Sequence, residues 1–409
     1  MLSSLPLDEQ VALLMRGVTF GDPQISATME AELRERLGES LRAGRPLTVY
    51  LGVDPTSSDL HLGHTVPLRK LRQFQDLGHQ VIFLIGSFTS LIGDPSDKDA
   101  ARPQQTPEQA RANAATYVEQ VWAVLDREHT IVEYNDRWLA GLDFGALIGL
   151  ASQFTVQQFL ARDNFRQRFR RGDAIWLHEF FYALMQAYDA LNLRTDVQVG
   201  GTEQLFNLMA GRKLMAARGL RPQICLTLPI LVGTDGHMRM SKSTGNCIGI
   251  REAPEVQYGK VMSIPDKAMR NYAELVTRWP PAEIKTHFAA LASGALHPRD
   301  LKMRLAREIV ASLYGEEAAA AAEEHFCTVF QQHEAPAGMP ELALTAETDV
   351  VSLLVAAGLA ASRSKARRLV EQGGVRLEGE MIENPEARIA PGDGVLQVGK
   401  RRFLRLTGD

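Results

Sequence analysis

The chain has 409 residues, which is enough for two or three domains with a large core. Apolar residues make up 45% and charged residues 23%, as in ordinary soluble proteins, and the lack of a long apolar run argues against a membrane span. The first residues lack a basic region and a cleavage site, so we expect no secretory signal. The three cysteines, Cys225, Cys247 and Cys327, lie too far apart to suggest a zinc site and indicate a reducing cytoplasm.

The net charge of −4 does not indicate nucleic-acid binding, but its distribution is uneven. Residues 349–409 hold 10 Lys+Arg and 8 Asp+Glu, a net +2, whereas the rest of the chain holds 35 and 41, a net −6. A basic tail on an acidic body fits a local patch that binds nucleic acid.

Residues 46–231 alternate between strand and helix patterns. We predict strands at 47–53, 80–86 and 130–134 and helices at 65–77 and 106–125. The second helix opens with a capping-box pattern at Thr106. Such alternation predicts an α/β, Rossmann-like parallel sheet that is covered by helices and holds ligands at the carboxyl ends of its strands. The helical stretch 140–171 is less regular and is predicted to be an insertion.

The rest of the chain has a different character. Residues 253–332 show only helical periodicity, and 331–340 read as a linker rich in Pro and Gly. Two short helices and short strands follow. We therefore predict three domains, a catalytic sheet domain at 1–252, an all-α domain at 253–335 and a small α+β RNA-binding domain at 345–409.

The segment 54–64 connects a strand to the start of a helix. Free N–H groups at such a position attract phosphate, and Gly63 permits close approach of a ligand. Thr56 and His61 are candidates to donate hydrogen bonds to terminal phosphates. A plain helix cap with two incidental histidines is the alternative.

Polar residues follow two other predicted strands. Asp94 is suited to an ammonium group, and Lys98 and Arg102 to phosphate, although a solvated surface turn has the same composition. After a later strand, Gly201 lies in a second tight turn and Glu203 could accept from ribose hydroxyls. A glycine-rich match at 394–400 is rejected as a phosphate loop because Arg401 follows it and a hairpin, not a helix, is expected there.

Two further segments carry polar side chains in unusual places. Tyr182, Gln186 and Asp189 recur on one face of an otherwise apolar helix at 174–192, which indicates a pocket rather than a partly exposed helix edge. The motif at 240–243 puts Lys242 on a polar loop that can reach phosphates from the side opposite to the first motif.

Together these residues resemble the bacterial tyrosyl-tRNA synthetases, of class I, over nearly the whole chain. The matching segments are 50–56 with 61–64, 199–204, 239–243 and 297–302. The C-terminal segment resembles a small RNA-binding fold named after a ribosomal protein of the small subunit. The resemblance implies a homodimeric, cytoplasmic tyrosine–tRNA ligase whose substrates are tyrosine, ATP with Mg²⁺, and tRNA(Tyr), with no protein-bound zinc and no membrane contact.

The resemblance also implies a role for each matching position. The predicted catalytic set is Thr56, His61, His64, Lys98, Arg102, Arg239 and Lys242. Tyrosine would meet Tyr50 and Asp189 at its phenol, Asp94, Tyr182 and Gln186 at its ammonium, and Gln204 near its carboxylate. Further ATP contacts would come from Gly52, Asp54, Gly63, Gly201, Glu203, Met240, Ser241 and Ser243. The RNA would meet Arg363, Lys365, Arg367 and Arg368.

The sequence departs from the family pattern at three positions. Arg239 stands where the family usually has lysine, and arginine keeps the charge but changes its geometry. Glu203 stands where aspartate is common. Leu51 stands where some members carry a side chain that reaches the ribose, and leucine cannot form that hydrogen bond.

Three other functions are compatible with parts of the pattern. The related tryptophan-specific synthetase can carry an equivalent aspartate, but Tyr50 and the C-terminal segment argue against it. A non-catalytic RNA-binding protein would not need His61, His64, Lys98 and Lys242. A nucleotidyltransferase that shares the first motif would not need the last 150 or so residues of this chain.

Overall fold

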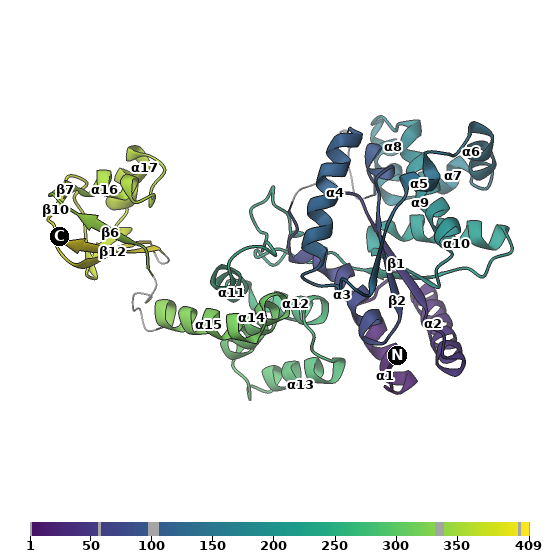
Figure 1. Cartoon of the computed structure of the whole chain (residues 1–409), viewed down its shortest axis with the longest axis horizontal. Coiled ribbons are helices and arrows are strands. Elements are labelled where there is room, and N and C mark those ends of the chain that lie inside the picture. The colour runs from purple at the N-terminus through teal and green to yellow at the C-terminus, as the bar shows by residue number, and fades with distance from the viewer. Residues whose placement is uncertain (1, 56–58, 97–105, 332–338, 400–401, 409) are drawn as a thin grey trace. The chain divides into compact units, whose positions relative to one another are not determined.

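The computed structural model describes residues 2–55, 59–96, 106–331, 339–399 and 402–408. The chain forms two compact units, Met1–Glu316 and Glu317–Asp409 (Figure 1). Within the described ranges no helix is both long and apolar enough to cross a membrane. The division into three domains stays a prediction, since the first unit contains the predicted sheet domain and most of the predicted all-α domain.

The first unit is built on a parallel sheet of order β3-β2-β1-β4-β5. Its strands are β1 (Thr48–Val53), β2 (Gln80–Ile85), β3 (Thr130–Tyr134), β4 (Val197–Gly201) and β5 (Ile224–Leu228). The chain runs outward from β1 to β3 and then returns to place β4 on the other side of β1. This reversal leaves a crevice at the carboxyl ends of β1 and β4, where doubly wound sheets bind ligands. The predicted α/β architecture is confirmed.

Helices cover both faces of this sheet (Figure 1). They are α1 (Leu7–Met15), α2 (Pro23–Ala43), α3 (Leu62–Asp76), α4 (Pro107–Val121), α9 (Leu177–Leu193) and α10 (Leu205–Ala217). The predicted capping box at Thr106 is present, with both reciprocal bonds to Gln109. Helix α3 begins earlier than residue 65, because His61 caps it.

The irregular stretch between β3 and α9 is a set of short helices. They are α5 (Asp136–Leu139), α6 (Phe144–Ala151), α7 (Val156–Leu160) and α8 (Asp163–Arg171). A fully buried ion pair joins Arg168 of α8 to Glu179 of α9 at 2.7 Å. The insertion is therefore attached to the helix that carries the predicted tyrosine contacts.

Helices follow the sheet, as predicted. They are α11 (Pro254–Met262), α12 (Met269–Val276), α13 (Pro281–Ala292), α14 (Pro298–Tyr314) and α15 (Glu316–Phe326), with a 3-10 helix at Asp266–Ala268 and a short π-helix at Cys327–Gln331. Gly315 follows α14 with φ of 89°, a conformation that side chains disfavour.

The second unit contains a small sheet of order β6-β12-β11-β8-β9 and a two-stranded pair β10-β7. Its elements are β6 (Glu341–Leu344), β7 (Thr348–Asp349), α16 (Val350–Ala356), α17 (Arg363–Glu371), β8 (Val375–Leu377), β9 (Glu380–Met381), β10 (Arg388–Ile389), β11 (Gly394–Val398) and β12 (Arg402–Gly408). The antiparallel pairing of β11 with β12 confirms a hairpin where the glycine-rich match was rejected. Strand β6, which lies between the predicted linker and the predicted start of the third domain, was not predicted.

Candidate active site

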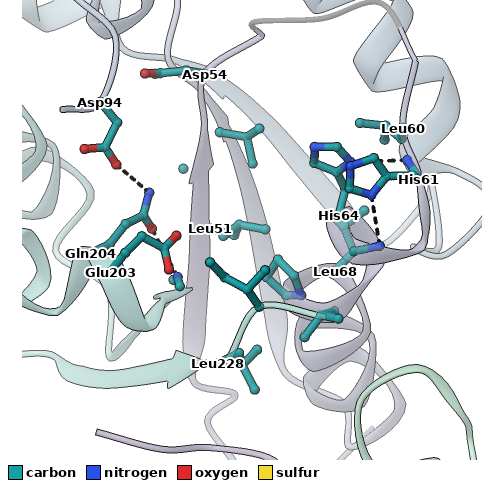
Figure 2. A pocket seen from close by; sticks show the side chains of 18 of the residues that line it. Leu51, Asp54, Leu60, His61, His64, Leu68, Asp94, Glu203, Gln204 and Leu228 are labelled. Atoms are coloured by element: carbon teal, nitrogen blue, oxygen red, sulfur yellow. Dashed lines mark hydrogen bonds between the residues drawn. The ribbon is translucent and has the colours of Figure 1, made fainter. Parts of the chain in front are cut away.

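A cavity of about 480 Å³ opens at the carboxyl ends of β1 and β4. In Figure 2, Asp94, Glu203 and Gln204 lie on one side of β1, and His61 and His64 lie on the other. Most of the predicted site residues in the described part of the first unit line it. They are Gly52, Asp54, His61, Gly63, His64, Asp94, Tyr182, Gly201, Glu203, Gln204, Arg239, Met240, Ser241 and Lys242. Residues that are far apart in the sequence are thus brought to one place.

The two histidines form the start of α3. The His61 Nδ1 accepts from the backbone N–H of Gly63 at 3.1 Å, and the His64 Nδ1 accepts from the N–H of His61 at 3.2 Å. Burial lowers the pKa of His61 to about 3 and that of His64 to about 4, helped by the nearby charge of Lys242. Both rings are therefore neutral at pH 7, and each carries its proton on Nε2 because Nδ1 accepts. Nε2 is the atom available to donate to a ligand.

The glycines of the two loops make room for neighbouring side chains. A Cβ on Gly63 would lie 2.9 Å from the His61 ring, and one on Gly201 would lie 2.1 Å from the carboxylate of Glu203. Close approach of a ligand was the reason expected for Gly63, and a tight turn was the one expected for Gly201. The structure gives a more local reason, since any side chain there would displace His61 or Glu203.

Asp94 lies in a loop after β2 and is 8% exposed. One of its carboxylate oxygens accepts from the N–H of Ser96, and the other accepts from the Gln204 amide at 3.1 Å. Gln204 in turn accepts from the N–H of Gly201. The two loops are thus joined across the ends of β2 and β4, with a carboxylate facing the cavity.

A chain of hydrogen bonds leads from this cavity into the core. The Tyr182 hydroxyl donates to Asp54 at 3.0 Å, and the Thr89 hydroxyl donates to the other oxygen of Asp54 at 2.7 Å. The Asn135 amide donates both to Thr89 and to Asp189, at 3.1 and 3.2 Å. Because each member contacts the next, a change at one position is expected to alter its neighbours.

Asp189 ends this chain and is 3% exposed. The indole N–H of Trp138 donates to it at 2.7 Å. Burial raises the pKa of Asp189 to about 7, although the bonds from Trp138 and Asn135 oppose the shift. The group can therefore change its charge near neutral pH, which is a property of carboxylates at functional sites.

Tyr50, Gln186 and Asp189 do not line the cavity, although all three were predicted to contact the substrate. Tyr50 is fully buried on β1 and close enough to Asp189 for the carboxylate to help raise its pKa, after burial itself. No described residue meets hydrogen-bond geometry with its hydroxyl, although the Gln223 amide lies near enough to moderate the shift. Gln186 accepts from the amide of Asn207. On this face of α9, Tyr182 and Asp189 are buried and Gln186 is half-buried, and the role of the three side chains in a substrate pocket stays a prediction.

The lysine loop, residues 239–246, lies beside the first motif because the chain that follows it pairs with the start of α3. His61 and Gly249 form an isolated antiparallel bridge, with the N–H of Leu62 donating to Ile248. Lys242 forms an ion pair with Asp59 at 2.9 Å, and both side chains are well exposed to solvent, at 43% and 60%. Ser243, which does not line the cavity, bonds the Ser241 hydroxyl.

Several side chains that bond or support the predicted site residues were not predicted from the sequence. Arg162 of the insertion donates to the Ser96 hydroxyl and lies over the rings of Phe165 and Phe206, and Asn164 donates to the Pro95 carbonyl. Trp138, Asn135 and Thr89 hold Asp189 and Asp54. These side chains come from segments without a recognisable motif, and their only signal was an asparagine and a tryptophan just after β3.

Of the seven other predicted residues, three are not described and four lie in the second unit. Thr56, Lys98 and Arg102 fall outside the described residues. Arg363, Lys365, Arg367 and Arg368 lie on α17 in the second unit, all of them exposed. Arg363 is 3.5 Å from Asp349 and Arg367 is 4.0 Å from Glu386, so part of this basic helix is balanced by acids.

The sequence of the chain matches known protein families and individual relatives. The model for "tRNA synthetases class I (W and Y)" matches residues 42–331, and the S4 domain model matches 350–395. A tyrosine–tRNA ligase of Moorella thermoacetica is 51% identical over 98% of this chain and 97% of its own length. One of Thermotoga maritima is 47% identical over 98% of each chain.

Solved structures agree with this placement. The tyrosyl-tRNA synthetase of Archaeoglobus fulgidus, crystallised with L-tyrosine, is 25% identical with a TM-score of 0.60, and the match covers 78% of this chain and all of that one. A truncated mitochondrial tyrosyl-tRNA synthetase of Aspergillus nidulans shares the fold with a TM-score of 0.63, over 79% of this chain and 94% of that one. The chain therefore belongs to the class I tRNA synthetases of the tryptophan and tyrosine group and carries a C-terminal S4 domain.

Proposed function

We propose that this protein is a tyrosine–tRNA ligase that acts in the cytoplasm. The observation that carries the proposal is the buried pair of Tyr50 and Asp189 in a member of this family. The Tyr50 hydroxyl is fully buried beside a carboxylate that titrates near neutrality, and no described residue meets hydrogen-bond geometry with it, although the Gln223 amide is near. Such a hydroxyl is costly to bury unless a ligand pairs with it. A substrate phenol, which both donates and accepts, has the required chemistry. The indole of tryptophan donates only, so it suits this pair less well.

In the first step, the carboxylate of tyrosine attacks the α-phosphorus of ATP. The bond to pyrophosphate breaks, and tyrosyl-adenylate forms. The attacking carboxylate is ionised at neutral pH, so no general base is needed. The enzyme contributes by holding both reactants and by stabilising charge on the departing pyrophosphate. Asp94, Gln204 and Tyr182 would orient tyrosine, and His61 and Lys242 would donate to phosphates.

In the second step, a hydroxyl of the terminal adenosine of tRNA(Tyr) attacks the acyl carbon and AMP leaves. The S4 domain is the proposed contact to RNA, through Arg363, Lys365, Arg367 and Arg368, since clustered basic side chains contact phosphates. Removing residues after Pro340 should leave adenylate formation intact and weaken tRNA charging. Unchanged charging would contradict the role of this unit.

Mg²⁺ is proposed to enter with ATP, held by phosphates and water rather than by a protein cage. Its chemistry would be to neutralise phosphate charge. Two carboxylates that face the cavity, Asp54 and Asp94, would stay oriented by their own hydrogen bonds.

We also propose that the protein is a homodimer. Several large apolar side chains are exposed on the insertion and at the start of α9, namely Phe144, Ile148, Val156, Phe169, Trp176 and Leu177. Exposed apolar patches of this kind mark protein interfaces. Light scattering of the full chain should report a dimer, and Phe144→Asp should shift it towards a monomer.

ATP–pyrophosphate exchange with each standard amino acid separates the alternatives. Exchange with tyrosine alone supports the proposal. Exchange with tryptophan would identify the other specificity of the family, and exchange with none would favour a non-catalytic RNA-binding protein. Exchange that needs no amino acid would favour a nucleotidyltransferase.

A further inference from the structure

The lysine loop contains one buried polar side chain, Asn246. It is 6% exposed, whereas the neighbouring residues 242–245 are exposed. Its backbone carbonyl accepts from the N–H of Thr234 at 2.9 Å. The segment that carries Lys242 thus ends at a residue that is fixed to the preceding hairpin.

The side chain of Asn246 contacts both ends of the loop. Its oxygen accepts from the N–H of Ser241 and from the hydroxyl of Thr244, each at 2.8 Å. Its amide nitrogen donates to the carbonyl of Arg239 at 3.0 Å and to the carboxylate of Asp235. Carbonyl and carboxylate oxygens only accept, so they fix the orientation of the amide.

Asp235 connects this amide to the turn of the hairpin. Its other carboxylate oxygen accepts from the N–H groups of His237 and Met238, at 2.9 and 2.8 Å. These bonds and the Asn246 amide lower the pKa of Asp235 to about 2. The hairpin itself is held by the bridge between Val232 and Arg239 and by the Tyr272 hydroxyl, which donates to Val232 at 3.0 Å.

Gly233 provides independent support for the position of this amide. A Cβ on Gly233 would lie 2.2 Å from the amide nitrogen of Asn246, so a side chain there is incompatible with the observed bonds. Without the Asn246 contacts, residues 241–245 would be joined to the hairpin only through their ends. Ordering each such residue costs conformational entropy, so Lys242 would be placed correctly less often.

We propose that Asn246 is a positioning residue for the activation step, which fixes the Lys242 loop to the hairpin at 232–239 through its bonds to Ser241, Arg239 and Asp235. This inference rests on the proposed tyrosine activation. Asn246 does not touch the reactants and acts through Lys242. Its loss should therefore lower the rate constant of activation while tyrosine binding is unchanged. Misplacement of a catalytic group by about 1 Å costs roughly 10²-fold in rate.

The test measures tyrosine dissociation constants and pyrophosphate-exchange kinetics of the full chain for Asn246→Ala, Asn246→Asp, Asp235→Asn and the double variant Asp235→Asn/Asn246→Asp. Each single change removes or mismatches the bond between the two side chains. In the double variant, the amide at 235 can donate to the carboxylate at 246, and the bonds from Ser241, His237 and Met238 are kept. The bond to Arg239 is lost, and the Arg239 carbonyl then faces a carboxylate oxygen, which also only accepts. We expect each single variant to lose about 10²-fold in kcat, with tyrosine affinity unchanged, and the double variant to recover part of it.

A separate pair of glycine variants tests the same contact. Gly233→Ala should reproduce the loss, whereas Gly141→Ala, where a Cβ meets nothing within 4 Å, should not. Full activity of Asn246→Ala, or a double variant no better than the worse single one, would overturn the inference. If the unmodified protein shows no exchange with tyrosine, the proposed function fails instead, and the two failures are thereby distinguished.

Discussion

Asp189 and Lys242 are held in opposite ways. Asp189 is buried and receives two hydrogen bonds from side chains that are themselves packed, Trp138 and Asn135. Lys242 is on an exposed loop, and its charged end meets Asp59 in an ion pair open to solvent. The Asp189 carboxylate, which would recognise the substrate phenol, is held in place before tyrosine binds. The Lys242 ammonium, which would bind phosphate, can exchange Asp59 for a phosphate at little cost in free energy.

This contrast predicts different sensitivities to mutation. Removing a group from the buried network leaves its donors unpaired, and each unpaired buried donor costs about 1–3 kcal/mol. Removing a group from the exposed loop should alter only the interaction with the reacting phosphates.

Asp189→Ala should have the largest effect. It removes an acceptor for the substrate phenol and leaves the donors of Trp138 and Asn135 unpaired, so kcat/KM for tyrosine should fall by about 10³-fold or more. Pyrophosphate exchange and calorimetric titration with tyrosine measure this. Asp196→Asn is the matched control, because Asp196 is a largely buried acid that bonds Thr48 and Arg36 away from the cavity. If Asp189→Ala binds tyrosine normally, the proposed pocket is wrong.

Lys242→Ala should have the next largest effect, and of a different kind. Loss of one donor to developing charge costs roughly 10²- to 10³-fold in rate. Tyrosine affinity should stay the same, since the lysine contacts no part of the Asp189 network in the structure. Stopped-flow measurement of adenylate formation gives the rate, and equilibrium titration gives the affinity. Equal losses in both would show that the two regions are not separate.

The sheet and most of its helices could be predicted because their patterns are local. The strand at 130–134, the capping box at Thr106 and the hairpin after β11 depend on neighbouring residues, and the structure confirms all three. The start of α3 was placed too late, since His61 does not resemble the usual Ser, Thr, Asp or Asn cap.

The site was predictable only where a motif marks it. The loops with His61, Glu203 and Lys242 combine glycine with polar residues, and they meet at the cavity as expected. Arg162 and Trp138 act across distances of about 50 residues or more in sequence, to Ser96 and Asp189. Nothing in the local pattern of an isolated arginine or tryptophan indicates which buried partner it will meet.

Trp138→Phe should weaken tyrosine binding by about tenfold at pH 7, because it removes one charge-assisted hydrogen bond to Asp189. It should also change the pH dependence. Asp189 has a pKa of about 7 before tyrosine binds, and it must lose its proton to accept a hydrogen bond from the phenol. The affinity for tyrosine should therefore fall as the pH drops below 7. Trp138→Phe lacks a bond that lowers the pKa of Asp189, so its tyrosine affinity should begin to fall at a higher pH than that of the parent protein.

Measuring the affinity for tyrosine between about pH 5.5 and about 8.5 tests the direction of this shift. His61 and His64, with pKa values of about 3 and 4, stay neutral over that range and should not contribute. An unchanged pH profile in Trp138→Phe would show that the indole does not control the charge of Asp189.

Asp59→Asn should have the smallest effect, and in the favourable direction. Exposed ion pairs are worth about 0–1 kcal/mol, so freeing Lys242 from this carboxylate should lower KM for ATP by up to about fivefold, with kcat unchanged. The gain should disappear at high salt, which screens the ion pair in the parent protein. Asp266→Asn breaks a similar pair with Lys302, at 2.7 Å, in a region that does not line the cavity, and should leave KM unchanged. A higher KM in Asp59→Asn would mean that Asp59 helps to position Lys242 for phosphate rather than competing with phosphate for it. The Lys242 ammonium would then be held in advance, like the Asp189 carboxylate, and the contrast between the two side chains would not stand.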